Sequence, residues 1–252
     1  MEKLLDSKHV DHIDLNFGCP VPKVTKHGGG GALPYKQTIF RSIVKSVVHA
    51  ADGEIPVTVK FSMGIDDNHL TYLDAGKIAE DEGVAAISLH ARTVEQLYSG
   101  HADWLAIREL KHHIKSIPIF GNGDIDSSQK ALSFKNKYGI DGIMIGRAAI
   151  GYPWIFNEIK HFIATGNELE PPSISERVEV AKRHLKLSLE WKGERLGIFE
   201  MRRHYTNYFK SLCMYIICTC ISNSTLNTLI TLCTYCTLSS LSTLNTLWSS
   251  YI

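Results

Sequence analysis

The chain has 252 residues, 44% of them hydrophobic, and a formal net charge of +1. This length suffices for one large domain or two smaller ones, and the balanced composition excludes a disordered chain and a strongly basic nucleic-acid binder overall. Residues 1–6 carry charges where a signal peptide requires an apolar run, so we expect a cytoplasmic protein.

Cys19 is the only cysteine in the first 212 residues and lies in a Gly-Cys-Pro turn after the apolar run 12–16. A thiol at the carboxyl end of a strand occupies the place where α/β barrels build their active sites. There it would donate a proton as a thiol or attack as a thiolate. The alternative is a small buried hydrophobic residue.

A glycine run at residues 27–32 follows Lys23 and Lys26. Its composition predicts a flexible loop, which near Cys19 would serve as a lid or a substrate loop.

Five short apolar runs predict strands at 12–16, 57–61, 86–90, 117–121 and 142–146. Helical patterns lie between them, as at 37–51 and 73–82. The spacing is typical of βα units, and the continuous apolar strands indicate a parallel sheet covered by helices.

A doubly wound sheet and a (β/α)₈ barrel both fit this pattern, but every predicted strand ends in residues of functional type. These are Cys19, Lys60, His90, Asn122 and the pair Gly146 and Arg147. We therefore predict a partial TIM (β/α)₈ barrel over residues 1–165, comprising the last five βα units and lacking the first three strands.

Lys60 lies within an apolar strand, so its ammonium group requires an anion or an acceptor at the strand end. A structural ion pair, a Schiff base and a contact to a cofactor ring all remain open. His90 and Arg92 end the next strand and indicate an anionic ligand or a nucleotide, although a core histidine is the usual alternative.

Glycine-rich turns follow the last two strands, at residues 121–124 and at Gly146 and Arg147. Such turns let backbone N–H groups approach a phosphate, and an arginine adds a charged fork. Two of them at the end of a barrel predict the common phosphate site of that fold.

The pattern becomes helical after residue 154, and Ser173 with Glu176 forms a capping box that opens a further helix. Residues 182–210 carry eight Lys and Arg against three Glu. We predict a small helical domain with a basic face over 166–211. The alternative is a solvated helix face.

Residues 211–252 contain no charged residue and five of the six cysteines. A metal site there matches zinc ribbons poorly, and the apolar run 212–221 is too short to span a membrane. We interpret 212–252 as a low-complexity tail that carries no native fold, most simply from a shifted reading frame or a mispredicted exon.

Taken together, the motifs of residues 10–210 resemble the flavin-dependent tRNA-dihydrouridine synthases, with the bacterial B-type branch most similar. The matching motifs are Asn16-x-Gly18-Cys19-Pro20, Val59-Lys60, His90-x-Arg92-Thr93, Asn122-Gly123-Asp124 and Gly146-Arg147-Ala148. The resemblance implies an FMN-bearing barrel and a helical tRNA-binding domain that reduce uridines to 5,6-dihydrouridine with NADPH.

By motif position, the resemblance implies that Cys19 donates a proton to the uracil, while Asn16 and Arg92 face it. Lys60 and His90 would lie against the flavin, and Asn122, Gly123, Asp124, Gly146 and Arg147 would hold its phosphate chain. In the helical domain, we expect tRNA phosphates to contact Lys182, Arg183, Lys186, Arg202 and Arg203.

We also expect a monomer without a metal ion or a membrane association. The absent first strands and the aberrant tail predict a fragment of such an enzyme. Two other readings are an inactive remnant that at most binds RNA, and another FMN barrel oxidoreductase that acts on a small pyrimidine.

Overall fold

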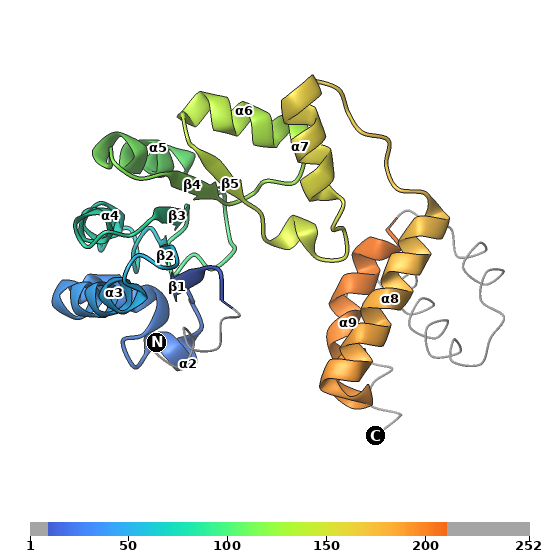
Figure 1. Ribbon diagram of the computed structural model, residues 1–252, viewed down its shortest axis with the longest axis horizontal. Helices are drawn as coiled ribbons and strands as arrows, with labels where there is room; N and C mark the ends of the chain where they lie inside the picture. Colours follow the sequence, from blue (N-terminus) through green and yellow to red (C-terminus); the bar gives the residue numbers. More distant parts are fainter. Residues whose placement is uncertain (1–9, 211–252) are drawn as a thin grey trace. The chain divides into compact units, whose positions relative to one another are not determined.

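The computed structural model describes residues 10–210 of the chain, and the predicted low-complexity tail lies outside them. Five strands form one parallel sheet in the order β1-β2-β3-β4-β5 (Figure 1). Their bounds are β1 Ile13–Phe17, β2 Val57–Ser62, β3 Ala86–His90, β4 Ile119–Asn122 and β5 Gly142–Met144. The α/β class and all five predicted strands are confirmed, with ends that differ by up to two residues.

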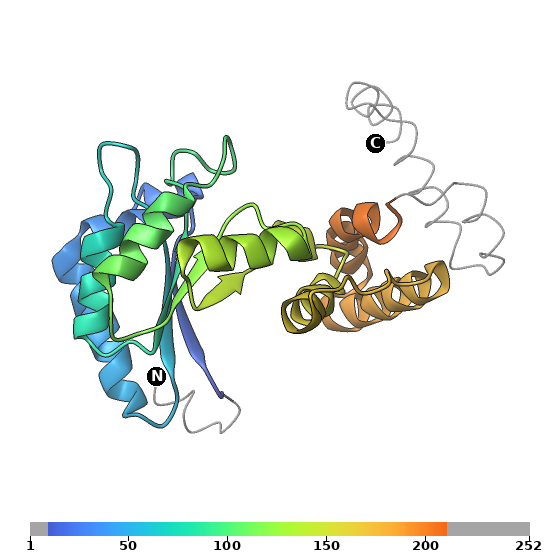
Figure 2. The same cartoon turned by 90° about the horizontal axis from the view of Figure 1, so that it is seen from above.

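The helices that follow the strands are α3 Gln37–Ala51, α4 Tyr72–Asp81, α5 Trp104–His113 and α6 Ser128–Tyr138. Each packs against its neighbour and lies on the outer side of the curved sheet (Figures 1 and 2). The Asp103 carboxylate accepts from Leu105 N–H at the start of α5, and the Ser127 hydroxyl accepts from Lys130 N–H at the start of α6. These caps satisfy N–H groups that a helix leaves unpaired.

The two faces of the sheet differ in chemistry because residues in register across a parallel sheet share a face. Phe17, Phe61 and Leu89 are in register and are buried. The alternate positions carry the polar side chains of Asn16 and Lys60, which are also in register with each other. The apolar face packs under the helices, so the polar residues line the opposite face.

The connection from β1 to α3 contains α2 (Pro22–Thr25) and the 3₁₀ helix η1 (Gly30–Tyr35). The prediction of a flexible loop for the glycine run was wrong for its second half, since Gly30 and Gly31 belong to η1 and Gly31 is buried. A Cβ atom on Gly30 would lie 2.6 Å from the carbonyl oxygen of Cys19. The glycines here permit close packing.

The chain divides into two compact units. Within residues 10–210, the first comprises the residues up to Arg147 together with Asn157–Glu168, and the second comprises Ala148–Phe156 and the residues from Leu169 onward. Thus the segment after β5, which includes most of the 3₁₀ turn η2 (Arg147–Ala149), belongs with the helical unit. The sequence pattern had assigned it to the barrel.

The remaining helices are α7 (Ile155–Thr165), α8 (Ile174–Lys192) and α9 (Glu194–Tyr208). At the start of α8 the Ser173 hydroxyl accepts from Glu176 N–H, as the capping box predicts. The helices α8 and α9 bury Ala181, Met201 and Tyr205 between them. No helix in residues 10–210 has the length and apolar composition to cross a membrane.

Candidate active site

Cys19 lies two residues beyond β1, half-buried and free of any disulfide. The Asn16 side-chain oxygen accepts from Gly18 N–H at 3.0 Å, which closes a tight turn just before the thiol. Gly31 N–H donates to the Cys19 carbonyl oxygen at 3.0 Å. The cysteine is therefore fixed from β1 and from η1, while the amide nitrogen of Asn16 remains available to a ligand.

Lys60 lies beside this turn, because a Cβ atom built on Gly18 would be 3.4 Å from the Lys60 ammonium nitrogen. Burial lowers the pKa of Lys60 from its usual range, and the negative charge of Asp14 partly offsets that effect. Thr58 donates its hydroxyl proton to Asp14 at 2.6 Å. A cation beside this turn favours binding of an electron-rich or anionic group there.

His90 is a neutral base at physiological pH. Burial, followed by the positive charges of Lys60, Arg92 and Arg147, lowers its pKa to about 4. Its ring centroid lies 6.5 Å from that of Tyr98. A neutral imidazole retains one donor and one acceptor nitrogen, so His90 can orient a polar ligand without adding charge.

This lowered pKa predicts a pH dependence of stability. The unfolded chain binds a proton at His90 below about pH 6.5, whereas the folded chain does so only near pH 4. Stability is therefore expected to fall as the pH drops through that interval. In urea unfolding at pH 7 and pH 5, His90→Gln should lose less stability than the wild type. An equal loss in both would contradict the assignment, and His112→Gln at an exposed position of α5 is the control.

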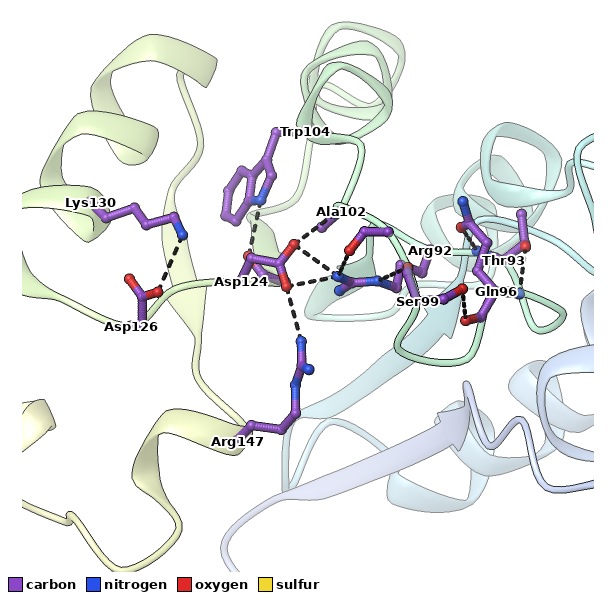
Figure 3. A network of polar contacts seen from close by, with 12 residues as sticks. Arg92, Thr93, Gln96, Ser99, Ala102, Trp104, Asp124, Asp126, Lys130 and Arg147 are labelled. Atoms are coloured by element: carbon purple, nitrogen blue, oxygen red, sulfur yellow. Dashed lines mark hydrogen bonds and ion pairs between the residues drawn. The ribbon is translucent and has the colours of Figure 1, made fainter. Parts of the chain in front are cut away.

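Asp124 is the centre of a charged network that joins three strand ends (Figure 3). Its carboxylate accepts from Arg92 Nη2 at 2.8 and 2.9 Å, from Arg147 Nη2 at 2.9 Å and from Ala102 N–H at 2.7 Å. Arg92 also donates to the Ser99 and Gly100 carbonyl oxygens. Two guanidinium groups share one carboxylate, so the network keeps one net positive charge.

The hydrogen bonds of Asp124 indicate that its side chain does not contact a phosphate directly, whereas the sequence had led us to expect such a contact. A carboxylate repels a phosphate, and the oxygens of Asp124 are occupied by Arg92, Arg147 and Ala102. Asp124 instead orients the two arginines. Its backbone has a φ of 56°, a left-handed conformation that is unusual outside glycine and is common in tight turns.

Arg92 is 1% exposed, and its buried Nη1 has no hydrogen-bond partner within residues 10–210. Its Nε and Nη2 already donate to Ser99, Gly100 and Asp124. Arg147 is 54% exposed and lies 5.0 Å over the Tyr98 ring. Its guanidinium is the cation of this network that an incoming anion can contact.

The two glycine-rich turns, at Gly123 and at Gly146, differ in how much free space surrounds their backbone. Gly123 has a φ of 138°, and a Cβ atom there would lie 2.5 Å from Ala102. No atom lies within 4 Å of a Cβ built on Gly146. The Asn122 amide donates to the Met144 carbonyl oxygen at 2.8 Å and so ties β4 to β5. The open backbone therefore lies at Gly146 and Arg147.

The candidate tRNA contacts lie in the helical unit. Lys182 pairs with Glu179 at 2.9 Å and Lys186 pairs with Glu190 at 3.9 Å. Arg183 is exposed, and the Arg202 guanidinium lies 5.6 Å over the Phe199 ring. Arg203 contacts His204. Lys182 and Lys186 thus already have carboxylate partners, which the count of charges along the sequence does not show.

The fold and these residues define a parallel α/β protein whose reactive groups gather at the carboxyl ends of its strands. A free thiol, a partly buried lysine, a neutral histidine and an exposed arginine at these strand ends are together typical of an enzyme active site. The chain belongs to the dihydrouridine synthase (Dus) family, whose model matches residues 3–216.

Relatives support the same assignment. The chain is 50% identical over 204 residues to a protein named "Probable tRNA-dihydrouridine synthase" of Mycobacterium leprae, which covers 81% of this chain and 53% of the relative. It is 41% identical over 192 residues to "tRNA-dihydrouridine synthase B" of Shewanella oneidensis, covering 76% of this chain and 59% of the relative. The chain thus spans about half the length of the curated relatives it matches.

Proposed function

We propose that this chain carries the reactive residues of an FMN-dependent tRNA-dihydrouridine synthase, which reduces uridines in tRNA with electrons from NADPH. The observation that supports this most directly is the free Cys19 at the carboxyl edge of the sheet, which follows Gly18, the residue that lies against the Lys60 ammonium group. Membership of the Dus family supports the same chemistry.

We propose that the five βα units form part of a (β/α)₈ barrel. The strands are parallel and sequential, and the helices α3 to α6 that connect and follow them lie on one side of the curved sheet. The polar residues on the other face, including Asn16 and Lys60, correspond to the interior of such a barrel near its carboxyl end.

The residues present fit FMN. The open backbone at Gly146 and the half-exposed Arg147 suit its phosphate, and the partly buried Lys60 and the neutral His90 suit its polar ring. When bound, FMN supplies the hydride that is added to C6 of the uracil. Asp124 holds Arg147 in place for the phosphate.

The Cys19 thiol would donate the proton that completes the reduction at C5. Hydride addition at C6 leaves negative charge on C5 and the neighbouring carbonyl, which a positioned acid neutralises. Asn16 is placed to orient the uracil through its amide nitrogen, because its oxygen is already bonded to Gly18. Arg92 would contribute its remaining Nη1 donor.

We propose that the helical unit binds tRNA through Lys182, Arg183, Lys186, Arg202 and Arg203. Surface ion pairs such as Lys182–Glu179 contribute about 0–1 kcal/mol, so a phosphate can replace the carboxylate partner. Each phosphate contact releases counterions and makes binding dependent on salt.

The test uses a chimera in which residues 10–210 replace the matching segment of the Mycobacterium leprae relative. We expect the chimera to purify with FMN and to convert uridines of an unmodified tRNA transcript to dihydrouridine in the presence of NADPH. A colourless chimera that FMN cannot reconstitute would overturn the cofactor assignment. A flavin-bound chimera that reduces free pyrimidines but no tRNA would favour a small-molecule oxidoreductase.

A further inference from the structure

The segment that follows the reactive cysteine is positively charged over an unusual length. Residues 15–51 contain five Lys and Arg and no Asp or Glu. Protein surfaces normally intersperse the two signs. Three of these lysines, Lys23, Lys26 and Lys36, lie on α2 and at the end of η1, in the connection from β1 to α3.

These three lysines are exposed and have no ion-pair partner among residues 10–210. Other cations of the same unit are paired: Lys77 with Asp81 at 2.8 Å and Lys111 with Asp141 at 2.7 Å. Unpaired positive charge is thus adjacent to Cys19 in the chain, and in the described residues it is not offset there by acidic side chains as it is at Lys77 and Lys111.

The loop is tied to the Cys19 turn. Gly31 N–H donates to the Cys19 carbonyl oxygen, and Gly30 packs against the same residue. The Lys36 ammonium lies so close to Gly28 that a side chain there would clash with it. The three charges are therefore carried by the same loop that fixes the thiol.

An exposed aromatic ring accompanies the charges. Tyr35 is 55% exposed, and its ring meets that of His69 edge to face with centroids 5.6 Å apart. His69 belongs to the loop after β2, where Asp66 is engaged by the His69 ring and by Asn68 N–H. Proteins that bind single-stranded nucleic acid combine aromatic rings, on which bases stack, with cations that contact phosphates.

We propose that the loop of residues 21–36 binds the backbone of single-stranded RNA on either side of the base presented to Cys19. Lys23, Lys26 and Lys36 contact phosphates, and Tyr35 stacks on a neighbouring base. This surface belongs to the sheet unit, whereas the cations of α8 and α9 belong to the helical unit. The ligand class rests on the proposed function, because a uridine that reaches Cys19 as part of a tRNA brings its flanking phosphates with it.

The test measures binding of the 252-residue chain to an oligouridylate of about eight nucleotides over a range of salt concentrations, without flavin. Replacing Lys23, Lys26 and Lys36 with Ala should reduce the salt slope by about 0.7 per lost contact, or about two in total. Affinity at about 0.1 M salt should fall roughly tenfold to hundredfold. Tyr35→Ala should lower affinity about tenfold and leave the slope unchanged, because stacking releases no counterions.

The matched control replaces Lys45, Lys115 and Lys137 with Ala. The ammonium groups of these exposed lysines have no carboxylate partner in the described part of the chain, and the lysines lie on α3, after α5 and on α6. The control should bind like the wild type. An equal loss in both triple variants, or no binding by the wild-type chain at low salt, would overturn the proposal.

Binding of polyglutamate with the same charge as the oligouridylate is measured as a comparison. Equal affinity with the same dependence on Lys23, Lys26 and Lys36 would assign the loop to acidic peptides and overturn the RNA assignment. Because the measurement involves no redox step, it can fail while the chimera reduces uridine, and it can succeed while the chimera is inactive. The two outcomes are therefore distinguishable.

Discussion

Replacing Cys19 with alanine is expected to lower the rate of uridine reduction by the chimera roughly 100- to 10,000-fold, the range for loss of a positioned general acid. The thiol follows β1 directly, and its turn is fixed by Asn16 and Gly31 rather than by its own side chain. The fold and the FMN site should therefore persist. Single-turnover mixing with a tRNA transcript in excess provides the rate.

Flavin content and the rate of flavin reduction by NADPH are the matched readouts, and both should stay within about twofold of the unsubstituted chimera because the thiol acts only in the uracil step. Cys19→Ser should retain a small part of the activity, because a hydroxyl is a weaker acid than a thiol. Near-normal dihydrouridine yield in Cys19→Ala at early times would rule out this thiol as the proton donor.

Replacing Asp124 with asparagine should lower the free energy of unfolding by about 3 kcal/mol or more, since it leaves the buried guanidinium of Arg92 without its carboxylate. Asp126→Asn is the control. Asp126 pairs with Lys130 at the surface at 3.4 Å, so its loss should change stability by less than about 1 kcal/mol. Urea unfolding of the two variants at neutral pH measures both effects.

The difference in the free energy of unfolding between the wild type and Asp124→Asn should depend on pH in a defined direction. Burial raises the pKa of Asp124, but the Ala102 N–H group and the two arginines together outweigh burial and hold that pKa below its usual range. The stabilisation is therefore complete above the ordinary pKa of an aspartate and is lost as the pH falls through the folded-state value. The unfolding curves of the wild type and Asp124→Asn should converge under acid conditions. A constant difference down to the lowest pH would argue against the ion pair as the cause.

The sequence predicts the sheet well because the strands are apolar on their buried face and end in glycine or polar residues. β3 and α3 have the predicted bounds, and β5 is shorter because its pairing with β4 ends at Asn122 and Met144. The capping box at Ser173 predicts the start of α8 correctly, since that signal is a local hydrogen bond.

Long-range contacts account for what the sequence did not reveal. Asp124 looked like a ligand contact because it stands in a glycine-rich turn, but it pairs with Arg92, which is 32 residues away. The glycine run looked flexible, but η1 packs against the Cys19 turn. The segment after β5 joins the helical unit because Gly151 lies against His204, and no periodicity encodes that contact.

The order of the strands leaves β1 and β5 at the two ends of the sheet, each without a second neighbouring strand in residues 10–210. An end strand exposes a row of peptide groups that can pair with another polypeptide, whereas a closed barrel exposes none. Charge gives little colloidal protection, because the net formal charge is only +1. Concentrated solutions of this chain are therefore prone to aggregate through edge-to-edge β-pairing between molecules.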